Sequence, residues 1–414
     1  MIIDSLQYNG LCSCGKDHRM QTELCIISKG CLKNTCQYLR DRGISGYTVA
    51  VYDKNTYRAT EGKRPAVDLE VVLDPTDLHA NEYGVDCLSK KLPLCARVLI
   101  AVGSGTIHDI TRYCAFKMNA EFISCPTAAS VDGFCSSVAA MTWHGCKKTL
   151  TAVAPRLVIA DTDVIMRAPI RLTRSGFGDM IGKYVALFDW KCANIITGEF
   201  YCRRIAKMTL DATEAVIDSV DGILSGDADA YEKLMYGLIM SGLAMQMMGN
   251  SRPASGAEHH ISHFIEMSPP AINSISNALH GEKVGVGTLL VIEEYKRIGN
   301  IPSPEFSDYR EFDSSEIVRI FGNEMAKEIF AENSRDSAIA VTKEALQSSR
   351  DALINEIRAL PSPAALLSIY RKFNVKSSLD DIGVRASKKD TLLKYSHLVR
   401  NRLTLMRIKK CISD

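Results

Sequence analysis

The sequence lacks a long hydrophobic run. No apolar stretch in its 414 residues approaches the roughly 20 residues that a transmembrane helix needs. Its first residues, MIIDSLQY, also lack the basic start and apolar core of a secretory signal peptide. We therefore expect a cytoplasmic protein with no transmembrane segment.

The sequence also lacks an excess of charge of either sign. Its 50 basic and 48 acidic side chains give a formal net charge of +2. This balance gives no electrostatic basis for binding nucleic acid or an anionic membrane surface. A hydrophobic content of 46% and a charged content of 24% are ordinary for globular proteins, so the chain can bury a full core. The length predicts roughly two to three domains.

The 14 cysteines do not indicate a secreted disulfide framework at this length. Most stand singly in apolar surroundings, where reduced cysteine behaves as a small hydrophobic residue. Cys12 and Cys14, followed by His18 in CSCGKDH, resemble half of a zinc site. Because no second cysteine pair lies nearby, this spacing alone does not predict a structural metal.

The N-terminal part of the chain carries short, nearly continuous apolar runs. Strands are predicted at residues 22–28, 46–53, 91–103, 120–125 and 156–161. Helical segments, such as residues 31–41, lie between them. This alternation is typical of a parallel sheet with crossover helices, and unbroken apolar runs fit strands buried on both faces. We predict an α/β nucleotide-binding domain over residues 1–165.

From residue 166 the pattern becomes helical. Residues 231–248 are apolar nearly all round and predict a buried helix. Amphipathic helices are expected at about residues 314–333, 336–360 and 362–373, with a last one ending at residue 411. We predict an all-α, metal- and substrate-binding domain over residues 166–414.

A glycine turn and an acidic strand end could hold a nucleotide. The sequence GSGTIHD at residues 103–109 stands between a predicted strand and a predicted helix. There the backbone can approach a pyrophosphate and the helix N-terminus supplies N–H donors. Asp53, which ends an earlier strand, could accept hydrogen bonds from a ribose and would repel a 2′-phosphate. A plain tight turn at the glycines, and a turn residue at Asp53, are the alternatives.

Residues 126–136, PTAASVDGFCS, are small or carry hydroxyls. Small side chains let a cofactor approach closely, and hydroxyls can bind its carboxamide or phosphates. Asp132 could bind the hydroxyls of a polyol. A buried loop whose hydroxyls are satisfied internally is the alternative.

The stretch SGAEHHISHFIEM at residues 255–267 is central to the prediction. Ser255 and Glu258 predict a capping box that opens a helix. His259 and His263 are four residues apart and therefore share one helical face. Such a pair alone is more often a surface or core feature than a metal site.

His280 and Asp179 extend this set of candidate ligands. His280 follows in LHGEKVGVG (residues 279–287), and Asp179 lies upstream in SGFGDMIGK (residues 175–183). Imidazoles and a carboxylate together suit a divalent metal such as zinc, iron or nickel.

Taken in order, GSGTIHD, PTAASVDG, SGFGDMIGK with Asp189–Trp190 behind it, AEHHISH and HGEKVGVG resemble the sn-glycerol-1-phosphate dehydrogenase family. That family belongs to the superfamily of glycerol dehydrogenase, iron-containing alcohol dehydrogenase and dehydroquinate synthase. The resemblance implies an N-terminal α/β nucleotide domain and a C-terminal helical metal domain. It covers residues 53–287 by motif.

The resemblance also implies roles for single residues. The metal ligands are Asp179, His259 and His280. Asp132, Asp179 and His263 contact the substrate, and of these Asp179 and His263 are the catalytic residues. The cofactor contacts are Asp53, Gly103, Gly105, Thr106, Ile107, His108, Asp109, Thr127, Ala128, Ala129, Ser130 and Ser136.

The implied reaction is the reversible reduction of dihydroxyacetone phosphate to sn-glycerol 1-phosphate. NAD(H) is favoured and NADP(H) is possible, with one divalent metal (zinc, nickel or iron) per subunit. His263 could deliver a proton, since imidazole can titrate near neutral pH. The resemblance also implies a homo-oligomer, with a dimer favoured.

Three alternatives remain open at this point. A glycerol dehydrogenase would act on unphosphorylated polyols. A dehydroquinate synthase-like lyase typically has Glu as its first ligand, so Asp179 argues against it. A non-catalytic relative would be expected to lose a metal ligand, and all three candidates are present.

Overall fold

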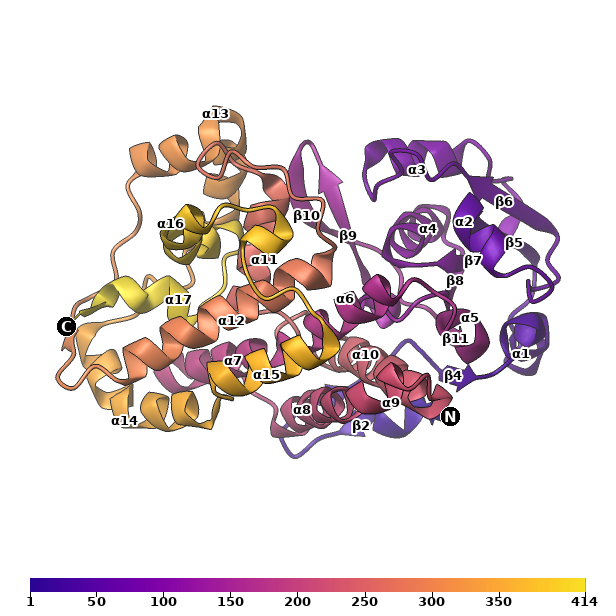
Figure 1. The fold of residues 1–414 in the computed structure, drawn as a ribbon. Coiled ribbons are helices and arrows are strands. Elements are labelled where there is room, and N and C mark those ends of the chain that lie inside the picture. The colour runs from indigo at the N-terminus through magenta and orange to yellow at the C-terminus, as the bar shows by residue number, and fades with distance from the viewer. Residues whose placement is uncertain (414) are drawn as a thin grey trace. The chain divides into compact units, whose positions relative to one another are not determined.

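The chain folds into two compact units, which are described separately (Figure 1). The computed structural model describes residues 1–413. The first unit comprises residues 1–180 and 211–250, and the second comprises residues 181–210 and those from 251 onward. The domain boundary predicted after residue 165 lies inside the first unit, to which residues 211–250 return.

The first unit is built on a seven-stranded sheet of order β1-β4-β11-β8-β7-β5-β6. Only β1 is antiparallel to its neighbour. The predicted parallel sheet is therefore confirmed, although β6 and a separate β9–β10 hairpin were not predicted. The strands are β1 (Ile2–Asp4), β4 (Leu24–Ser28), β5 (Tyr47–Asp53), β6 (Leu69–Leu73), β7 (Ala96–Gly103), β8 (Glu121–Pro126), β9 (Val138–Trp143), β10 (Cys146–Thr151) and β11 (Leu157–Asp161).

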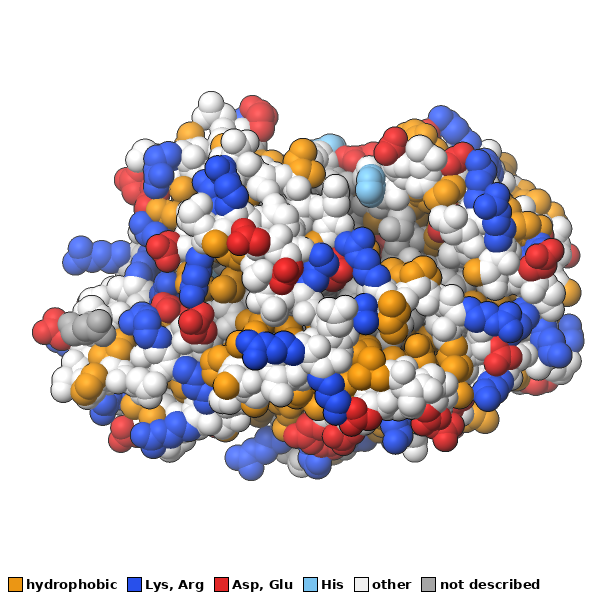
Figure 2. Space-filling model, viewed as in Figure 1, with side chains coloured by type: hydrophobic (Ala, Val, Ile, Leu, Met, Phe, Trp, Pro, Cys, Tyr) orange, Lys and Arg blue, Asp and Glu red, His pale blue; other side chains and the backbone are white. Residues whose placement is uncertain are grey.

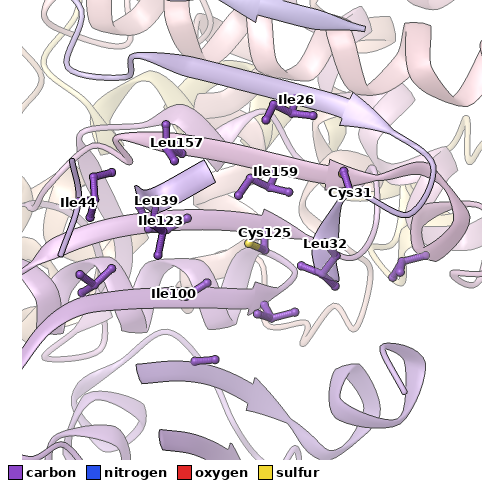
Figure 3. Close-up of a cluster of buried hydrophobic side chains, with 14 of the residues drawn as sticks. Ile26, Cys31, Leu32, Leu39, Ile44, Ile100, Ile123, Cys125, Leu157 and Ile159 are labelled. Atoms are coloured by element: carbon purple, nitrogen blue, oxygen red, sulfur yellow. The ribbon is translucent and has the colours of Figure 1, made fainter. Parts of the chain in front are cut away.

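Helices cover both faces of this sheet, because its strands are apolar on both sides. On β7, Ile100 faces a cluster completed by α1 (Thr35–Asp41), whereas Leu99 faces one completed by α3 (Glu82–Ser89) and α4 (Gly105–Met118). Figure 3 shows the first cluster, in which side chains from β4, β11, β8 and β7 lie along one face. The unit also contains α2 (Lys54–Ala59), α5 (Thr162–Ile165), α9 (Val220–Leu224) and α10 (Ala228–Met248). The buried helix predicted at residues 231–248 is α10.

Two helices run across the division between the units, namely α6 (Ile170–Ile181) and α8 (Arg203–Asp218). In the first unit α6 packs against the loop that follows β8. A Cβ placed on Gly176 would lie 2.2 Å from the Ala129 carbonyl oxygen. The absence of a side chain at Gly176 therefore sets how closely α6 approaches this loop.

The second unit is helical apart from the short β12–β13 pair. Its elements are α7 (Lys183–Thr197), α11 (Ala257–Met267), α12 (His280–Gly299), β12 (Glu305–Phe306), α13 (Ser314–Glu332), α14 (Lys343–Ala359), α15 (Pro363–Phe373), α16 (Lys389–Tyr395), α17 (Leu405–Ile408) and β13 (Ile412–Ser413). The helix predicted over 336–360 begins only at Lys343, because the side chain of Thr342 caps it by accepting from Ala345 N at 3.2 Å. The last predicted helix is reduced to α17 and a short 3-10 turn.

A buried carboxylate organises the second unit. Asp189 on α7 is fully buried. Its Oδ2 accepts from Ala257 N, the first residue of α11, at 2.9 Å. Its Oδ1 accepts from Leu405 N, the first residue of α17, at 3.0 Å and from the Tyr295 hydroxyl at 2.7 Å. One side chain therefore satisfies the N-termini of two helices, which have unpaired N–H groups and a positive dipole end.

The described residues 1–413 contain no helix with the length and apolar character needed to cross a membrane. Basic and acidic side chains are interspersed over the face seen in Figure 2, in keeping with the formal net charge of +2.

Replacing Gly176 with Ala should destabilise the first unit. The added methyl would overlap the Ala129 carbonyl, and we expect a loss of about 1–3 kcal/mol in the free energy of unfolding. Gly133→Ala is the matched control, since its Cβ would meet no atom within 4 Å. Urea unfolding followed by fluorescence measures both variants. Equal stability of the two would contradict this account of the α6 contact.

Asp189→Asn should destabilise the second unit, because an amide in place of Oδ2 leaves the Ala257 N–H without an acceptor. We expect a loss of about 1–3 kcal/mol. Thermal unfolding should show this loss, whereas the exposed Asp351→Asn on α14 should leave the midpoint unchanged.

The parent protein and Asp189→Asn should also differ in how their free energy of unfolding depends on pH. Burial raises the pKa of Asp189 from 3.8 to about 7, so between these pH values the folded protein keeps a proton that the unfolded chain has released. Protonated Asp189 therefore stabilises the folded protein at low pH. This stabilisation falls as pH rises through this window, by at most about 4 kcal/mol. Subtracting the unfolding curves of Asp189→Asn from those of the parent at pH 4 and pH 8 isolates this contribution. A difference that does not change with pH would show that Asp189 is ionised throughout.

Candidate active site

In the first unit, the carboxyl ends of three adjacent strands carry the predicted cofactor residues. Gly103 of β7 pairs with Pro126 of β8, and Val51 of β5 pairs with Ala101 of β7. Asp53, two residues beyond Val51, therefore ends β5 at the same edge as Gly103. Ligands of open parallel sheets bind at such an edge, where strand order changes direction.

Asp53 has a structural role as well as a favourable position. It is the N-cap of α2, and its Oδ1 accepts from Asn55 N at 2.7 Å and from Thr56 N at 2.8 Å. The cap holds the carboxylate at the carboxyl edge of the sheet.

The predicted glycine turn joins β7 directly to α4. A Cβ on Gly103 would lie 2.6 Å from Cβ of Ile107, so only glycine allows the helix to begin this close to the strand. The following loop is tied to the turn, because Thr127 N donates to Gly103 O at 2.9 Å. Gly105 and Thr106 lie in the first turn of α4, where N–H groups are available to a phosphate.

His108 supports this turn from behind. Its Nδ1 lies 3.0 Å from Ser104 O and its Nε2 lies 2.9 Å from the Ser124 hydroxyl. Since a carbonyl oxygen only accepts, Nδ1 carries the proton and Nε2 accepts from Ser124. Burial, with the charge of Arg112, lowers the pKa of His108 to about 3, so the ring is neutral. The structure gives both ring nitrogens partners within the protein.

The loop after β8 is held by the buried guanidinium of Arg112. This side chain donates to Gly133 O at 2.7 Å, to Phe134 O at 3.2 Å and to Val138 O at 2.9 Å. The Ser136 hydroxyl also donates to Val138 O, at 2.9 Å. Arg112 was not predicted from the sequence, because no motif marks an arginine whose role is to donate hydrogen bonds to the carbonyl oxygens of a loop. The predicted cofactor residues Thr127, Ala128, Ala129, Ser130 and Ser136 are all buried in this loop.

Two predicted substrate residues lie together in the first unit. The backbone N–H of Asp132 donates to Oδ2 of Asp179 at 3.0 Å, and both side chains are buried. Ser241 on α10, which was not predicted, donates its hydroxyl to Oδ2 of Asp132 at 2.8 Å. These contacts fix two carboxylates whose charges attract cations or hydroxyl donors.

In the second unit, three predicted histidines form one cluster. His259 and His263 lie one turn apart on α11, and His280 is the first residue of α12. Ring centroids are 5.3 Å apart for His259 and His280, 5.8 Å for His263 and His280, and 6.1 Å for His259 and His263. The helices pack closely because a Cβ on Gly287 would lie only 2.8 Å from Glu258 O.

Two of these rings have a carboxylate on Nδ1. His259 Nδ1 lies 2.5 Å from Glu258 Oε1, and His280 Nδ1 lies 2.9 Å from Glu266 Oε1. A carboxylate only accepts, so Nδ1 carries the proton in both rings and Nε2 becomes the atom able to bind a metal. Neither glutamate was predicted to have this role. Within the unit, the donor atoms of His263, Glu266 and His280 also lie close enough together to bind a metal ion.

The predicted capping box at the start of this helix is wrong. The helix begins at Ala257, and its N-cap is Gly256, which has no side chain with which to cap it. Glu258 instead accepts from Gly256 N at 2.8 Å with the oxygen that also bonds His259. The capping role belongs to Asp189, which lies too far away in sequence for a local motif to show.

Burial lowers the pKa of His263 below its ordinary value of 6.5. Lys183 lies fully buried, and its ammonium donates to Ala254 O at 3.0 Å.

Comparison with known proteins agrees with this geometry. Residues 26–169 match the model of the iron-containing alcohol dehydrogenase family. A glycerol-1-phosphate dehydrogenase [NAD(P)+] of Geobacillus thermodenitrificans is 33% identical over 395 residues, which cover 93% of this chain and 91% of the relative. A protein of the same name from Bacillus licheniformis is 38% identical over 300 residues, covering 70% of this chain and 74% of the relative.

A solved structure shows the same fold. The sulfoacetaldehyde reductase of Bifidobacterium kashiwanohense, determined in complex with NAD+, has a TM-score of 0.61 at 14% identity, covering 95% of this chain and 97% of that one. Identity and coverage with the two dehydrogenases extend well beyond the five sequence motifs. The chain therefore belongs to the glycerol-1-phosphate dehydrogenase family.

Proposed function

We propose that this protein catalyses the NAD(P)H-dependent reduction of dihydroxyacetone phosphate to sn-glycerol 1-phosphate, and the reverse reaction. The observation that carries the proposal is the match, over 93% of the chain, to a relative named for this activity. In the reduction, hydride passes from the nicotinamide to C2 and a proton passes to the ketone oxygen. The nicotinamide carries the redox chemistry, and the protein binds and orients the reactants.

The edge of the parallel sheet is the proposed site for NAD(P)H. The first turn of α4 faces the pyrophosphate, and Asp53 faces the ribose that is next to the adenine. A carboxylate there accepts from a 2′-hydroxyl and repels a 2′-phosphate. We therefore propose a preference for NADH over NADPH.

A single divalent metal is proposed to bind Asp179, His259 and His280. The donor set fits, because one carboxylate and two imidazoles suit zinc, nickel or iron. The two imidazoles are already in the tautomer that a ligand needs, since Glu258 and Glu266 each hold a proton on Nδ1. When bound, the metal would supply Lewis acidity that polarises the substrate carbonyl.

The remaining polar groups are proposed to orient the substrate. Asp132, fixed by Ser241 and by its own N–H bond to Asp179, can accept from a substrate hydroxyl. His263 is proposed to bond the substrate and to take part in delivering the proton.

The substrate assignment predicts a selective reaction. Purified protein loaded with zinc, nickel or iron should oxidise NADH in the presence of dihydroxyacetone phosphate and not with dihydroxyacetone. A chelator should abolish the rate, and NADPH should support a slower one. A rate only with the unphosphorylated ketone would instead assign the protein to polyol oxidation.

The carboxylate on His280 predicts a graded loss of metal. Glu266→Gln keeps an acceptor for Nδ1 but removes its charge, so we expect metal affinity to fall by about 10- to 100-fold. Competition with a chromogenic chelator measures this change. Glu293→Gln is the matched control, since Glu293 lies on the exposed side of α12, the helix that begins at His280, and pairs with Lys389.

Asp179→Ala should bind no metal at this site and should be inactive. The exposed Asp86→Ala is its control and should keep both properties. Retention by Asp179→Ala of a metal with only oxygen and nitrogen ligands would remove this residue from the ligand set and favour His263, Glu266 and His280.

A further inference from the structure

A second group of metal-binding side chains lies near the N-terminus, in the first unit. Strands β2 (Gly10–Leu11) and β3 (Asp17–His18) form a hairpin in which Gly10 pairs with His18. Its turn is closed by Cys12 N donating to Lys16 O and Gly15 N donating to Cys12 O, both at 2.9 Å. Gly15 has a φ of +85°, a conformation that favours glycine. The sequence CSCG thus forms a tight loop that turns both cysteines toward His18.

The donor atoms of the three residues converge. Sγ of Cys12, Sγ of Cys14 and a ring nitrogen of His18 all lie within 4.8 Å of one another. Cys14 Sγ is 3.3 Å from His18 Nε2. Tetrahedral zinc, with Zn–S of about 2.3 Å and Zn–N of about 2.0 Å, places its sulfur and nitrogen ligands about 3.5 Å apart. The observed spacing matches that geometry.

His18 is held in the tautomer that ligation requires. Its Nδ1 lies 2.8 Å from the carbonyl oxygen of Met247, on α10 of the same unit. Because that oxygen only accepts, Nδ1 carries the proton and the lone pair of Nε2 faces the sulfurs. A histidine that donates its far N–H to a carbonyl is the usual arrangement of a metal ligand. Cys12 and His18 are buried, and Cys14 is half-buried.

The hairpin is short and is anchored to α10. Both strands have two residues, and an isolated hairpin of this kind is marginal in water. It is anchored to α10 through His18 and, just beyond, through Gln246, whose Oε1 accepts from Gln21 N at 3.0 Å and from Thr22 N at 3.2 Å. A metal bridging the turn and His18 would fasten the loop to this anchor.

We propose that Cys12, Cys14 and His18 bind a zinc ion in a structural site separate from the proposed catalytic metal. Binding releases the two thiol protons, so that both cysteines ligate as thiolates. Structural zinc sites are closed by four protein ligands, and we expect a fourth from elsewhere in the chain. The site contains sulfur, whereas the proposed catalytic ligands contribute only oxygen and nitrogen, so the two metals can be distinguished.

X-ray absorption at the zinc edge tests this proposal on the full chain. Zinc-loaded protein should contain two equivalents of zinc and show sulfur neighbours at about 2.3 Å. Cys14→Ser should lose one equivalent together with part or all of the sulfur signal. Cys95→Ser, at an exposed cysteine, should retain both. A zinc spectrum with only oxygen and nitrogen neighbours, or an unchanged sulfur signal in Cys14→Ser, would overturn the proposal.

A second comparison does not depend on the folding of a cysteine variant. Asp179→Ala should lose the zinc with oxygen and nitrogen ligands, so its remaining equivalent should show a purer sulfur environment. If Asp179→Ala holds no zinc with sulfur neighbours, the proposed structural site is wrong. An inactive parent protein that still contains sulfur-bound zinc would contradict the proposed function and leave this site standing.

Discussion

The second unit depends on a carboxylate whose hydrogen-bond partners lie far from it in the sequence. Asp189 is buried on α7 and accepts from the first N–H of α11 and the first N–H of α17. The α11 helix has only 11 residues and a glycine N-cap without a capping side chain, so its start would otherwise lack an acceptor. Because His259 lies two residues after Ala257, the position of the first candidate imidazole follows from that bond. The buried hydrogen bond between Asp189 and Ala257 thus fixes where the candidate histidines on α11 lie.

Close backbone contacts make this arrangement possible. A Cβ on Gly256 would lie 2.8 Å from both Asp189 Oδ2 and Glu258 Oε2, and one on Gly287 would lie 2.8 Å from Glu258 O. In the first unit Gly103 and Gly176 serve the same purpose around the loop after β8. The glycines in the sequence motifs therefore shape the site through packing, because each removes the one atom that would separate two elements carrying functional groups.

Much of this could be predicted from the sequence, where the information is local. The turn at Gly103, the shared face of His259 and His263, and the apolar runs of β7 and β8 follow from spacing and periodicity. What could not be predicted depends on distant partners. The spacing of Ser255 and Glu258 predicts a capping box, which the structure does not have. The cap from Asp189 could not be predicted, because it depends on how α7 packs against α11. The lowered pKa of His263 depends in the same way on burial in the folded unit.

Four histidines in the described residues differ in the groups that their two ring nitrogens contact. In His18, His108, His259 and His280 an acceptor fixes the proton on Nδ1, so each presents Nε2 as a lone pair. For His108 that lone pair meets the hydroxyl of Ser124, and the ring is a structural element. For His18 it meets a sulfur, and for His259 and His280 it belongs to rings that lie 5.3 Å apart. This difference separates His108, whose ring belongs to the scaffold, from the three histidines for which metal sites are proposed.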